Sequence, residues 1–261
     1  PPPERQAGMH QHDAGHDSLG PQRARQVALG AVLLLAAGAT APDAGWAQDP
    51  PAATEVAQMT EGIHWLGHDS FCIEGDGRVV YLDPYRLERD GPKADLVLIT
   101  HDHHDHCSPA DVARIRADGT VVVTTAAASA KLPGPVRTVA PGDTLTVAGI
   151  RIEAVPAYNT NKFRSPGQPF HPRQAGTVGF VLTIGRRRIY HAGDTDAIPE
   201  MAAVRADVAL LPVSGTYVMT VEEAAQAAAT IKPKVAVPMH VGAGIGSLED
   251  AANFKAQADV P

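Results

Sequence analysis

The chain has 261 residues, a formal net charge of −7 and 44% hydrophobic residues, which favours one large folded domain. The acidic balance argues against a nucleic-acid binder that relies on a basic surface. Only two cysteines occur, Cys72 and Cys107, so the sequence predicts no disulfide framework, although a single bridge between the two stays an alternative.

The first 47 residues have the pattern of a secretory signal peptide. Arg23 and Arg25 precede an apolar run over 27–37, which is too short to span a bilayer, and a small-residue site at 45–47 follows. We therefore expect residues 1–47 to be removed on export, to the periplasm or outside the cell, leaving no stable membrane anchor. Residues 48–61, rich in Pro and Ala, predict a disordered lead-in.

The remaining segment, 62–261, predicts one folded domain that opens with strands. Three short β patterns with Gly-rich turns are followed by a fourth that ends at a histidine cluster. We expect strands near 63–67, 70–74, 79–83, 96–99, 121–123, 144–147, 150–155, 178–184, 188–191, 208–211 and 235–238, and helices from Pro109, Thr220 and Leu248. In each half, alternating strands precede strand–helix alternation. This order predicts an α/β (α+β) domain with two sheets face to face and helices outside them.

Four of the chain's 12 histidines lie within six residues, in the segment Thr100-His101-Asp102-His103-His104-Asp105-His106. The segment directly follows the apolar run 96–99, so it forms a loop at the carboxyl end of a strand, where binding groups usually sit. Imidazole and carboxylate bind zinc, iron and manganese. One tight turn cannot aim every group at a single ion. A loop that serves two ions would use His101 and His103 for one, and Asp105 and His106 for the other; the alternative is a solvated polar loop.

The pattern His-x-His-x-Asp-His after a strand that ends in Thr100 resembles the signature of the metallo-β-lactamase superfamily. That resemblance implies a four-layer αββα sandwich over most of 62–261. It also implies two divalent metal ions, zinc being the first choice and manganese or iron the alternatives.

Two later strand ends extend the resemblance. Asp194 follows the strand near 188–191 on a Gly-permitted turn, and His240 follows the strand near 235–238. In the superfamily the matching aspartate bridges the two ions and the matching histidine binds the second ion. The resemblance therefore implies Asp194 as the bridging ligand and His240 as a ligand of the second ion.

The third histidine of the first ion is where the chain departs from the superfamily pattern. The strand near 150–155 is followed by Tyr158 and Asn159, where a histidine is common, and a loop then leads to His171. A subgroup with Ala-Tyr-Asn followed by His-Pro is similar to this chain. We expect His171 to reach the first ion, with Asn159 or open solvent as the alternatives and a mononuclear site as the consequence if neither binds.

Further residues are expected around the ligands. The turn 67–70 resembles the Gly-His-Ser/Ala turn of lactonase-like members, so His68 would line the pocket or hydrogen-bond a ligand. Asp83, in Asp-Pro, resembles the carboxylate that orients a metal-bound imidazole. Tyr217 lies in a loop after a strand and could contact substrate or simply form a turn.

The resemblance implies a metal-dependent hydrolase in which a hydroxide shared by two metal ions attacks an ester, lactone or phosphodiester. Asp105 or Asp194 could shuttle the proton. Lactonases acting on ascorbate phosphate and N-acyl-phosphatidylethanolamine phospholipases are the branch it resembles most. The alternatives are a non-catalytic or mononuclear metal-binding protein of the same fold, and a β-lactamase. A small-molecule substrate is expected and no nucleic acid; the oligomeric state stays open.

Overall fold

A computed structural model describes residues 51–88 and 90–261. The expected signal peptide, residues 1–47, lies outside the described residues. Two six-stranded sheets and five α-helices form the framework of the described chain. Within this part of the chain, no helix is both long and apolar enough to cross a membrane.

The first sheet has the strand order β1–β2–β3–β4–β5–β6. Its strands are β1 (Ile63–Gly67), β2 (Ser70–Gly75), β3 (Arg78–Leu82), β4 (Leu96–Ile99), β5 (Val121–Thr124) and β6 (Val136–Thr138). The first three strands pair antiparallel, whereas β3, β4, β5 and β6 pair parallel. The carboxyl ends of β3, β4 and β5 therefore lie at the same edge of the sheet.

The second sheet repeats this plan with the order β14–β13–β12–β11–β8–β7. Its strands are β7 (Thr144–Val147), β8 (Ile150–Pro156), β11 (Val178–Ile184), β12 (Arg187–His191), β13 (Val208–Pro212) and β14 (Val235–Met239). The strands β7, β8, β11 and β12 pair antiparallel, and β12, β13 and β14 pair parallel. A separate hairpin, β9 (Phe163–Ser165) and β10 (Gln168–Pro169), extends from the segment between β8 and β11.

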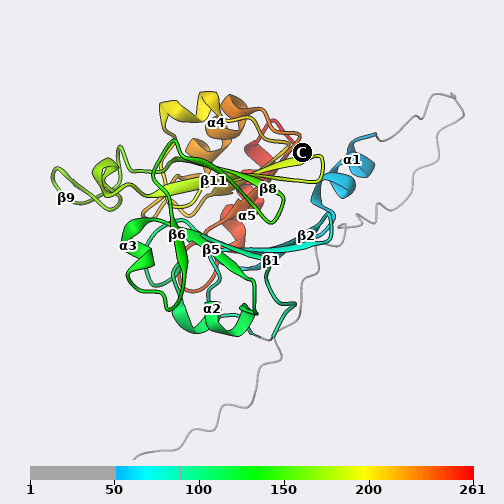
Figure 1. Cartoon of the computed structure of the whole chain (residues 1–261). Helices are drawn as coiled ribbons and strands as arrows, with labels where there is room; N and C mark the ends of the chain where they lie inside the picture. Colours follow the sequence, from blue (N-terminus) through cyan, green and yellow to red (C-terminus); the bar gives the residue numbers. More distant parts are fainter. Residues whose placement is uncertain (1–50, 89) are drawn as a thin grey trace, which may run out of the picture. The chain divides into compact units, whose positions relative to one another are not determined.

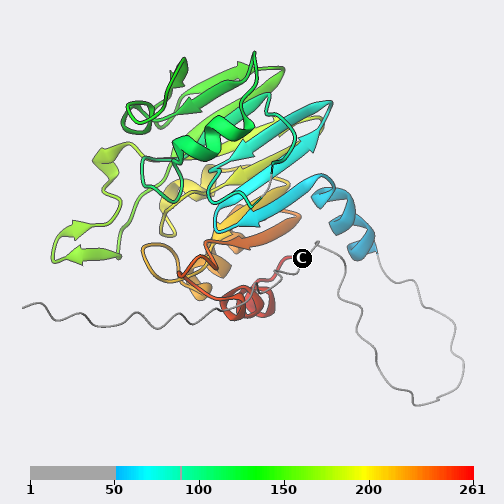
Figure 2. The ribbon, with the colours of Figure 1, turned by 90° about the horizontal axis from the view of Figure 1, so that it is seen from below.

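Helices cover the outer face of each sheet (Figure 1). These are α2 (Pro109–Ile115) and α3 (Ala126–Ser129) on the first sheet, and α4 (Val221–Ile231) on the second. The last helix, α5 (Leu248–Gln257), packs against α4 and the edge strand β14. Figure 2 shows the first sheet from the side that α2 covers. Ser108 caps α2, and Thr220 forms a capping box with Glu223 at the start of α4. Two short 3-10 turns, η1 (Arg173–Ala175) and η2 (Pro199–Ala203), lie in the connections.

One apolar core fills the space between the sheets. It joins Phe71 and Leu98 of the first sheet to Ile152 and Phe180 of the second, and all four side chains are fully buried. A smaller core lies between the first sheet and its helices, where Val97 is one of the buried residues. The four-layer αββα sandwich that the resemblance implied is therefore confirmed. The two cysteines are free and buried.

We expected a disordered lead-in over 48–61. This prediction is wrong for residues 51–60, because Pro51–Thr60 form helix α1. The segment is rich in alanine after its first residue, which favours a helix. Val56 and Met59 pack against the core from the helix side. Arg187 Nη1, from the start of β12, donates hydrogen bonds to the carbonyls of Met59 at 3.1 Å and Glu61 at 2.5 Å. These contacts supply partners for carbonyls at the end of the helix.

Candidate metal centre

The predicted ligands meet at the edge where the parallel strands of both sheets end. The loop 100–106 follows β4, Asp194 lies three residues after β12, and His240 directly follows β14. Backbone hydrogen bonds tie the loops of the two sheets together. Val178 N–H donates to the carbonyl of Thr100, and His240 N–H donates to that of His68, each at 3.2 Å. The side chains are therefore held on a rigid frame.

Asp83, directly after β3, holds the base of the ligand loop and is fully buried. Its Oδ1 accepts the N–H of Thr100 at 2.8 Å, and its Oδ2 accepts the Thr100 hydroxyl at 2.6 Å. Its Oδ2 also lies 2.8 Å from His106 Nδ1, which donates to it. With Nδ1 occupied in this way, a neutral His106 keeps its lone pair on Nε2. The orienting contact expected of Asp83 is therefore present.

Four side chains form what we call the first cluster: His101, His103, His171 and Asp194. Their ligand atoms all lie within 4.8 Å of one another. His103 Nδ1 lies 3.0 Å from His101 Nε2 and 3.2 Å from His171 Nε2, and Asp194 Oδ2 lies 3.3 Å from His171 Nε2. Ligands of one tetrahedral ion with bonds of about 2.0–2.1 Å are separated by roughly 3.3–3.5 Å. The first cluster could therefore hold one metal ion.

Asn159 lies behind His171 rather than in the first cluster. Its Oδ1 accepts the backbone N–H of His171 at 2.8 Å and lies 3.0 Å from His171 Nδ1. Its Nδ2 donates to Asp196 Oδ1 at 3.0 Å and to the Tyr217 carbonyl at 2.8 Å, which fixes the orientation of the amide. The oxygen can only accept, so Nδ1 of His171 carries the proton and Nε2 faces the first cluster with its lone pair. The structure thus places His171 in the first cluster and Asn159 as the residue that orients it.

A second cluster consists of Asp69, His106, Asp194 and His240, again with ligand atoms within 4.8 Å of one another. Asp194 Oδ1 lies 3.3 Å from His106 Nε2 and 3.5 Å from His240 Nε2. On the far side of the His240 ring, Nδ1 lies 2.8 Å from Ser214 Oγ. Asp194 therefore presents one oxygen to each cluster, which is the arrangement expected of a carboxylate that bridges two ions.

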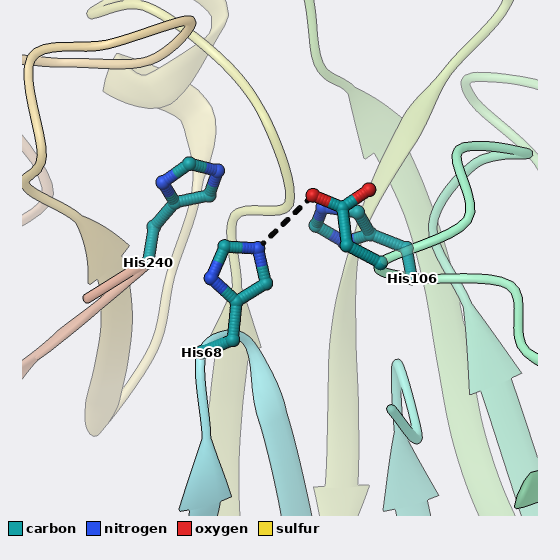
Figure 3. A group of neighbouring side chains, drawn as sticks. His68, His106 and His240 are labelled. Atoms are coloured by element: carbon teal, nitrogen blue, oxygen red, sulfur yellow. Dashed lines mark hydrogen bonds and ion pairs between the residues drawn. The ribbon is translucent and has the colours of Figure 1, made fainter. Parts of the chain in front are cut away.

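Asp105 and His68 lie beside the second cluster. Asp105 Oδ2 lies 3.2 Å from His68 Nε2, and both residues can be grouped with His106 and His240 within 4.8 Å. Figure 3 shows the ring of His68 between those of His106 and His240, with the dashed line marking its bond to the carboxylate. Asp105 was predicted as a ligand of the second ion; the structure brings it to the edge of the second cluster and pairs it with His68.

Sequence reasoning missed Asp69. This residue lies in the turn between β1 and β2 and is fully buried. Its Oδ2 lies 3.6 Å from His106 Nε2 and 3.9 Å from His240 Nε2. The available signal was a carboxylate beside His68, between two apolar strands, where a buried charge needs a partner.

Buried polar atoms without hydrogen-bond partners concentrate at this site. Seven such side-chain atoms occur among the described residues, and the only one outside the site is the Tyr190 hydroxyl. The other six are His68 Nδ1, both carboxylate oxygens of Asp69, His106 Nε2, Asp194 Oδ1 and His240 Nε2. Leaving such a group unpaired costs roughly 1–3 kcal/mol, and more when it is charged. Bound cations would remove much of this cost, so the donor set fits divalent metal ions.

Burial lowers the pKa of the imidazoles in the first cluster. The pKa of His171 falls to about 4, and the pKa values of His101 and His103 also lie below the ordinary value for histidine. These side chains are therefore neutral at neutral pH. A neutral imidazole is the form that binds a metal ion.

The imidazoles of the second cluster behave in the opposite way. Burial disfavours their charged form, but nearby carboxylates outweigh it. Asp194 and Asp83 raise the pKa of His106 well above its ordinary value. Asp194 and Asp69 raise the pKa of His240 to about 9. The carboxylates thus make this pocket strongly attractive to cations, and a metal ion that enters it must displace protons.

His104 and Tyr217 lie outside the two clusters. His104, in the middle of the ligand loop, has a side chain that is 86% exposed. Tyr217, a candidate substrate contact, has its ring 4.6 Å from that of Phe170, the residue before His171. Tyr217 therefore lies next to the first cluster, where its backbone carbonyl also supports Asn159.

Comparisons with known proteins identify the family of the chain. A family model for the beta-lactamase superfamily domain matches residues 62–240. A UPF0173 metal-dependent hydrolase of Thermoplasma acidophilum is 34% identical over 210 residues, which cover 75% of this chain and 90% of the relative. A UPF0173 metal-dependent hydrolase of Methanoculleus marisnigri is 37% identical over 184 residues, which cover 68% of this chain and 80% of the relative.

Solved structures give the same result. A provisionally named metal-dependent hydrolase of Parabacteroides distasonis has 36% sequence identity and a TM-score of 0.66, with coverage of 76% of this chain and 90% of that chain. Igni18, a metallo hydrolase of Ignicoccus hospitalis, has 26% identity and a TM-score of 0.60, with coverage of 76% and 93%. The ligand-bearing loops, the αββα sandwich and these relatives together show that the chain belongs to the metallo-β-lactamase superfamily, among the UPF0173 metal-dependent hydrolases.

Proposed function

We propose that this hydrolase works with two divalent metal ions, one in each cluster and bridged by Asp194, and cleaves an ester, lactone or phosphodiester bond in a small molecule. The observation that carries the proposal is the position of Asp194. Its Oδ2 lies 3.3 Å from His171 Nε2 and its Oδ1 lies 3.3 Å from His106 Nε2, so one carboxylate faces two separate groups of imidazoles. Zinc fits the imidazole-rich first cluster, and manganese or iron are the alternatives.

When bound, two such ions polarise a carbonyl or phosphoryl oxygen and lower the pKa of a water toward about 7. The residues of the chain supply orientation and proton transfer. Asp194 is 4% exposed, whereas the Asp105 side chain is 15% exposed. Asp105 is thus the carboxylate of the site that can take a proton from an attacking water and release it to solvent. Burial raises the pKa of Asp105. The hydrogen bond with His68 and the charge of His106 lower this pKa by more than burial raises it, so the net pKa is below the ordinary value and the group is ionised at neutral pH.

The surroundings of His171 suit a small organic substrate. Phe170 and Pro172, which flank His171 in the chain, line a surface hollow of about 450 Å³ together with Arg164. The Arg164 guanidinium lies 5.5 Å from the centre of the Phe170 ring, and Phe163 on the same hairpin is 47% exposed. An apolar surface with one cation next to it can bind the organic part and a negative group of an ester or phosphodiester.

The test combines metal content with a substrate panel. The protein would be loaded with zinc or manganese and assayed on p-nitrophenyl esters, lactones, bis(p-nitrophenyl) phosphate and a β-lactam. We expect hydrolysis of at least one of the first three classes, with loss of activity in His101→Ala and in His240→Ala. Two bound ions without turnover of any of them would favour the non-catalytic alternative, and turnover of the β-lactam alone would favour a β-lactamase.

We also propose that residues 1–47 direct export, since their basic flank, apolar run and small-residue site have the pattern of a signal peptide. Expression of the full chain with and without these residues, followed by cell fractionation and N-terminal sequencing, tests this. A processed N-terminus near residue 48 outside the cytoplasm is expected. Full-length protein that stays in the cytoplasm would contradict it.

A further inference from the structure

We propose that Asp69 is a further ligand of the second metal ion, beside His106, His240 and Asp194. This inference rests on the proposed binuclear centre and adds a residue to it. In the turn that resembles Gly-His-Ser/Ala, this chain has a carboxylate in the third position. This chain therefore has an anion that can bind a metal at the position where the Gly-His-Ser/Ala turn has a neutral side chain.

The first reason is the burial of the carboxylate without a partner. Asp69 is 0% exposed, and within the described part of the chain neither of its oxygens has a hydrogen-bond partner. A buried carboxylate is normally paired, hydrogen-bonded or bound to a metal. The nearest basic atoms are imidazole nitrogens, since Asp69 Oδ2 lies 3.6 Å from the Nε2 atoms of His68 and His106 and 3.9 Å from that of His240. These distances are too long for hydrogen bonds and leave room for a cation between the atoms.

The second reason is which imidazole nitrogens Asp69 faces. A carboxylate that only orients a ligand histidine faces the nitrogen that does not bind the metal. Asp83 does this, because it pairs with Nδ1 of His106. Nδ1 of His240 is likewise occupied, by Ser214 Oγ at 2.8 Å. Asp69 instead faces the Nε2 atoms of His106 and His240, neither of which has a hydrogen-bond partner among the described residues. Its position is that of a ligand.

The third reason is the spacing. Four ligands of one tetrahedral ion with bonds of about 2.0–2.2 Å lie roughly 3.3–3.6 Å apart. In the second cluster the separations from Asp194 Oδ1 to His106 and His240 are 3.3 and 3.5 Å. Those from Asp69 Oδ2 are 3.6 and 3.9 Å. A shift of a few tenths of an ångström in Asp69 would therefore complete the set.

The turn itself does not depend on the carboxylate. The Asp69 carbonyl accepts from His191 Nε2 at 2.9 Å, and the carbonyl of His68 accepts from Trp65 Nε1 at 3.0 Å. The Ser70 hydroxyl donates to the carbonyl of Asp83 and accepts the N–H of Tyr85 at 2.8 Å. Backbone groups and neighbouring side chains thus fix the turn, and the carboxylate of Asp69 is left free to bind a metal ion.

One consequence is a difference between the two sites. The first cluster offers three imidazoles and one carboxylate, and the second offers two imidazoles and two carboxylates. Carboxylate-rich sites suit manganese better than imidazole-rich sites do. With Asp69 as a ligand, the second site should accept Mn²⁺ more readily than the first.

The test uses full-length protein and two substitutions, Asp69→Asn, which keeps the shape and removes the charge, and Asp69→Ser. Bound Zn²⁺ and Mn²⁺ per chain would be measured by elemental analysis, and the affinity of each site by calorimetric titration of the metal-free protein. We expect two ions in the unsubstituted protein. In both variants we expect one tightly bound ion and a second ion that binds roughly 100-fold more weakly. This factor is at the upper end of the loss in metal affinity that follows removal of a residue supporting a metal ligand. The retained first ion and an unchanged circular dichroism spectrum show that the variants fold.

Asp102→Asn is the matched control, because Asp102 lies in the ligand loop but pairs with Lys131 at 2.7 Å instead of facing a cluster. It should keep two ions with unchanged affinities. Two ions at unchanged affinity in Asp69→Asn would overturn the assignment of Asp69 and leave the binuclear centre standing. A single ion in the unsubstituted protein would overturn the binuclear centre and the assignment together, so the two failures can be told apart.

Discussion

Replacement of Asp83 by asparagine should move a proton within His106. Asp83 accepts three hydrogen bonds, two from Thr100 and one from His106 Nδ1, at 2.6–2.8 Å. In Asp83→Asn the amide oxygen must take the Oδ1 position to accept the Thr100 N–H, and the NH₂ group then faces His106. Two donors cannot bond to each other, so a neutral His106 would accept at Nδ1 and carry its proton on Nε2. That tautomer has no lone pair for the second ion.

The size of the effect follows from the lost bond. A hydrogen bond to a charged group contributes about 1.5–3 kcal/mol, and each 1.4 kcal/mol is a factor of about ten in affinity. The second ion should therefore bind roughly 10- to 150-fold more weakly in Asp83→Asn, whereas the first ion should be unaffected. Calorimetric titration of the metal-free protein measures both affinities in one experiment. Equal affinity of the second ion in Asp83→Asn and the unsubstituted protein would refute this account of how His106 is oriented.

Three further predictions concern pH, His171 and the core. The pKa of metal-free His240 is about 9, the pKa of His106 is also raised, and a metal must displace both protons. Affinity for the second ion should therefore fall at least tenfold per pH unit below 9, while the first ion, whose His171 has a pKa of about 4, should be retained down to about pH 5. Metal titrations between pH 5 and 9 in which both ions respond alike would contradict this. Asn159→Ala should weaken the first ion roughly 10- to 100-fold and spare the second, and calorimetry that shows no change would mean that His171 needs no such support. Phe180→Ala, which opens a cavity between the sheets, should lower the free energy of unfolding by about 3–5 kcal/mol in urea denaturation, and a loss below about 1 kcal/mol would argue against the tight inter-sheet packing.

The parts of the site that could be predicted from sequence are those with a local signature. The loop 100–106 contains several ligand types in seven residues after an apolar strand, so its position in the fold follows from the pattern. Asp194 and His240 could be found because each follows a strand in the order that the resemblance to the superfamily implies. The sandwich itself follows from the order of strands and helices together with the resemblance.

The features that could not be predicted depend on contacts between distant segments. The positions of His171 and Asn159 depend on the hydrogen bond that Asn159 Oδ1 accepts from His171 Nδ1 and on the bond that Asn159 Nδ2 donates to Asp196. Asp69 can be recognised as a candidate ligand only in the folded chain, where His106 and His240, from two other loops, lie next to it. Helix α1 was missed because part of its stabilisation comes from Arg187, more than 120 residues later in the chain.

A crystal structure of the zinc- or manganese-loaded protein with anomalous diffraction data would show directly whether Asp194 bridges two ions. We expect two anomalous peaks about 3.5–4 Å apart. One should lie among His101, His103 and His171, the other should lie beside His106 and His240, and one oxygen of Asp194 should point to each. A single peak, or two peaks of which only one contacts Asp194, would contradict this expectation.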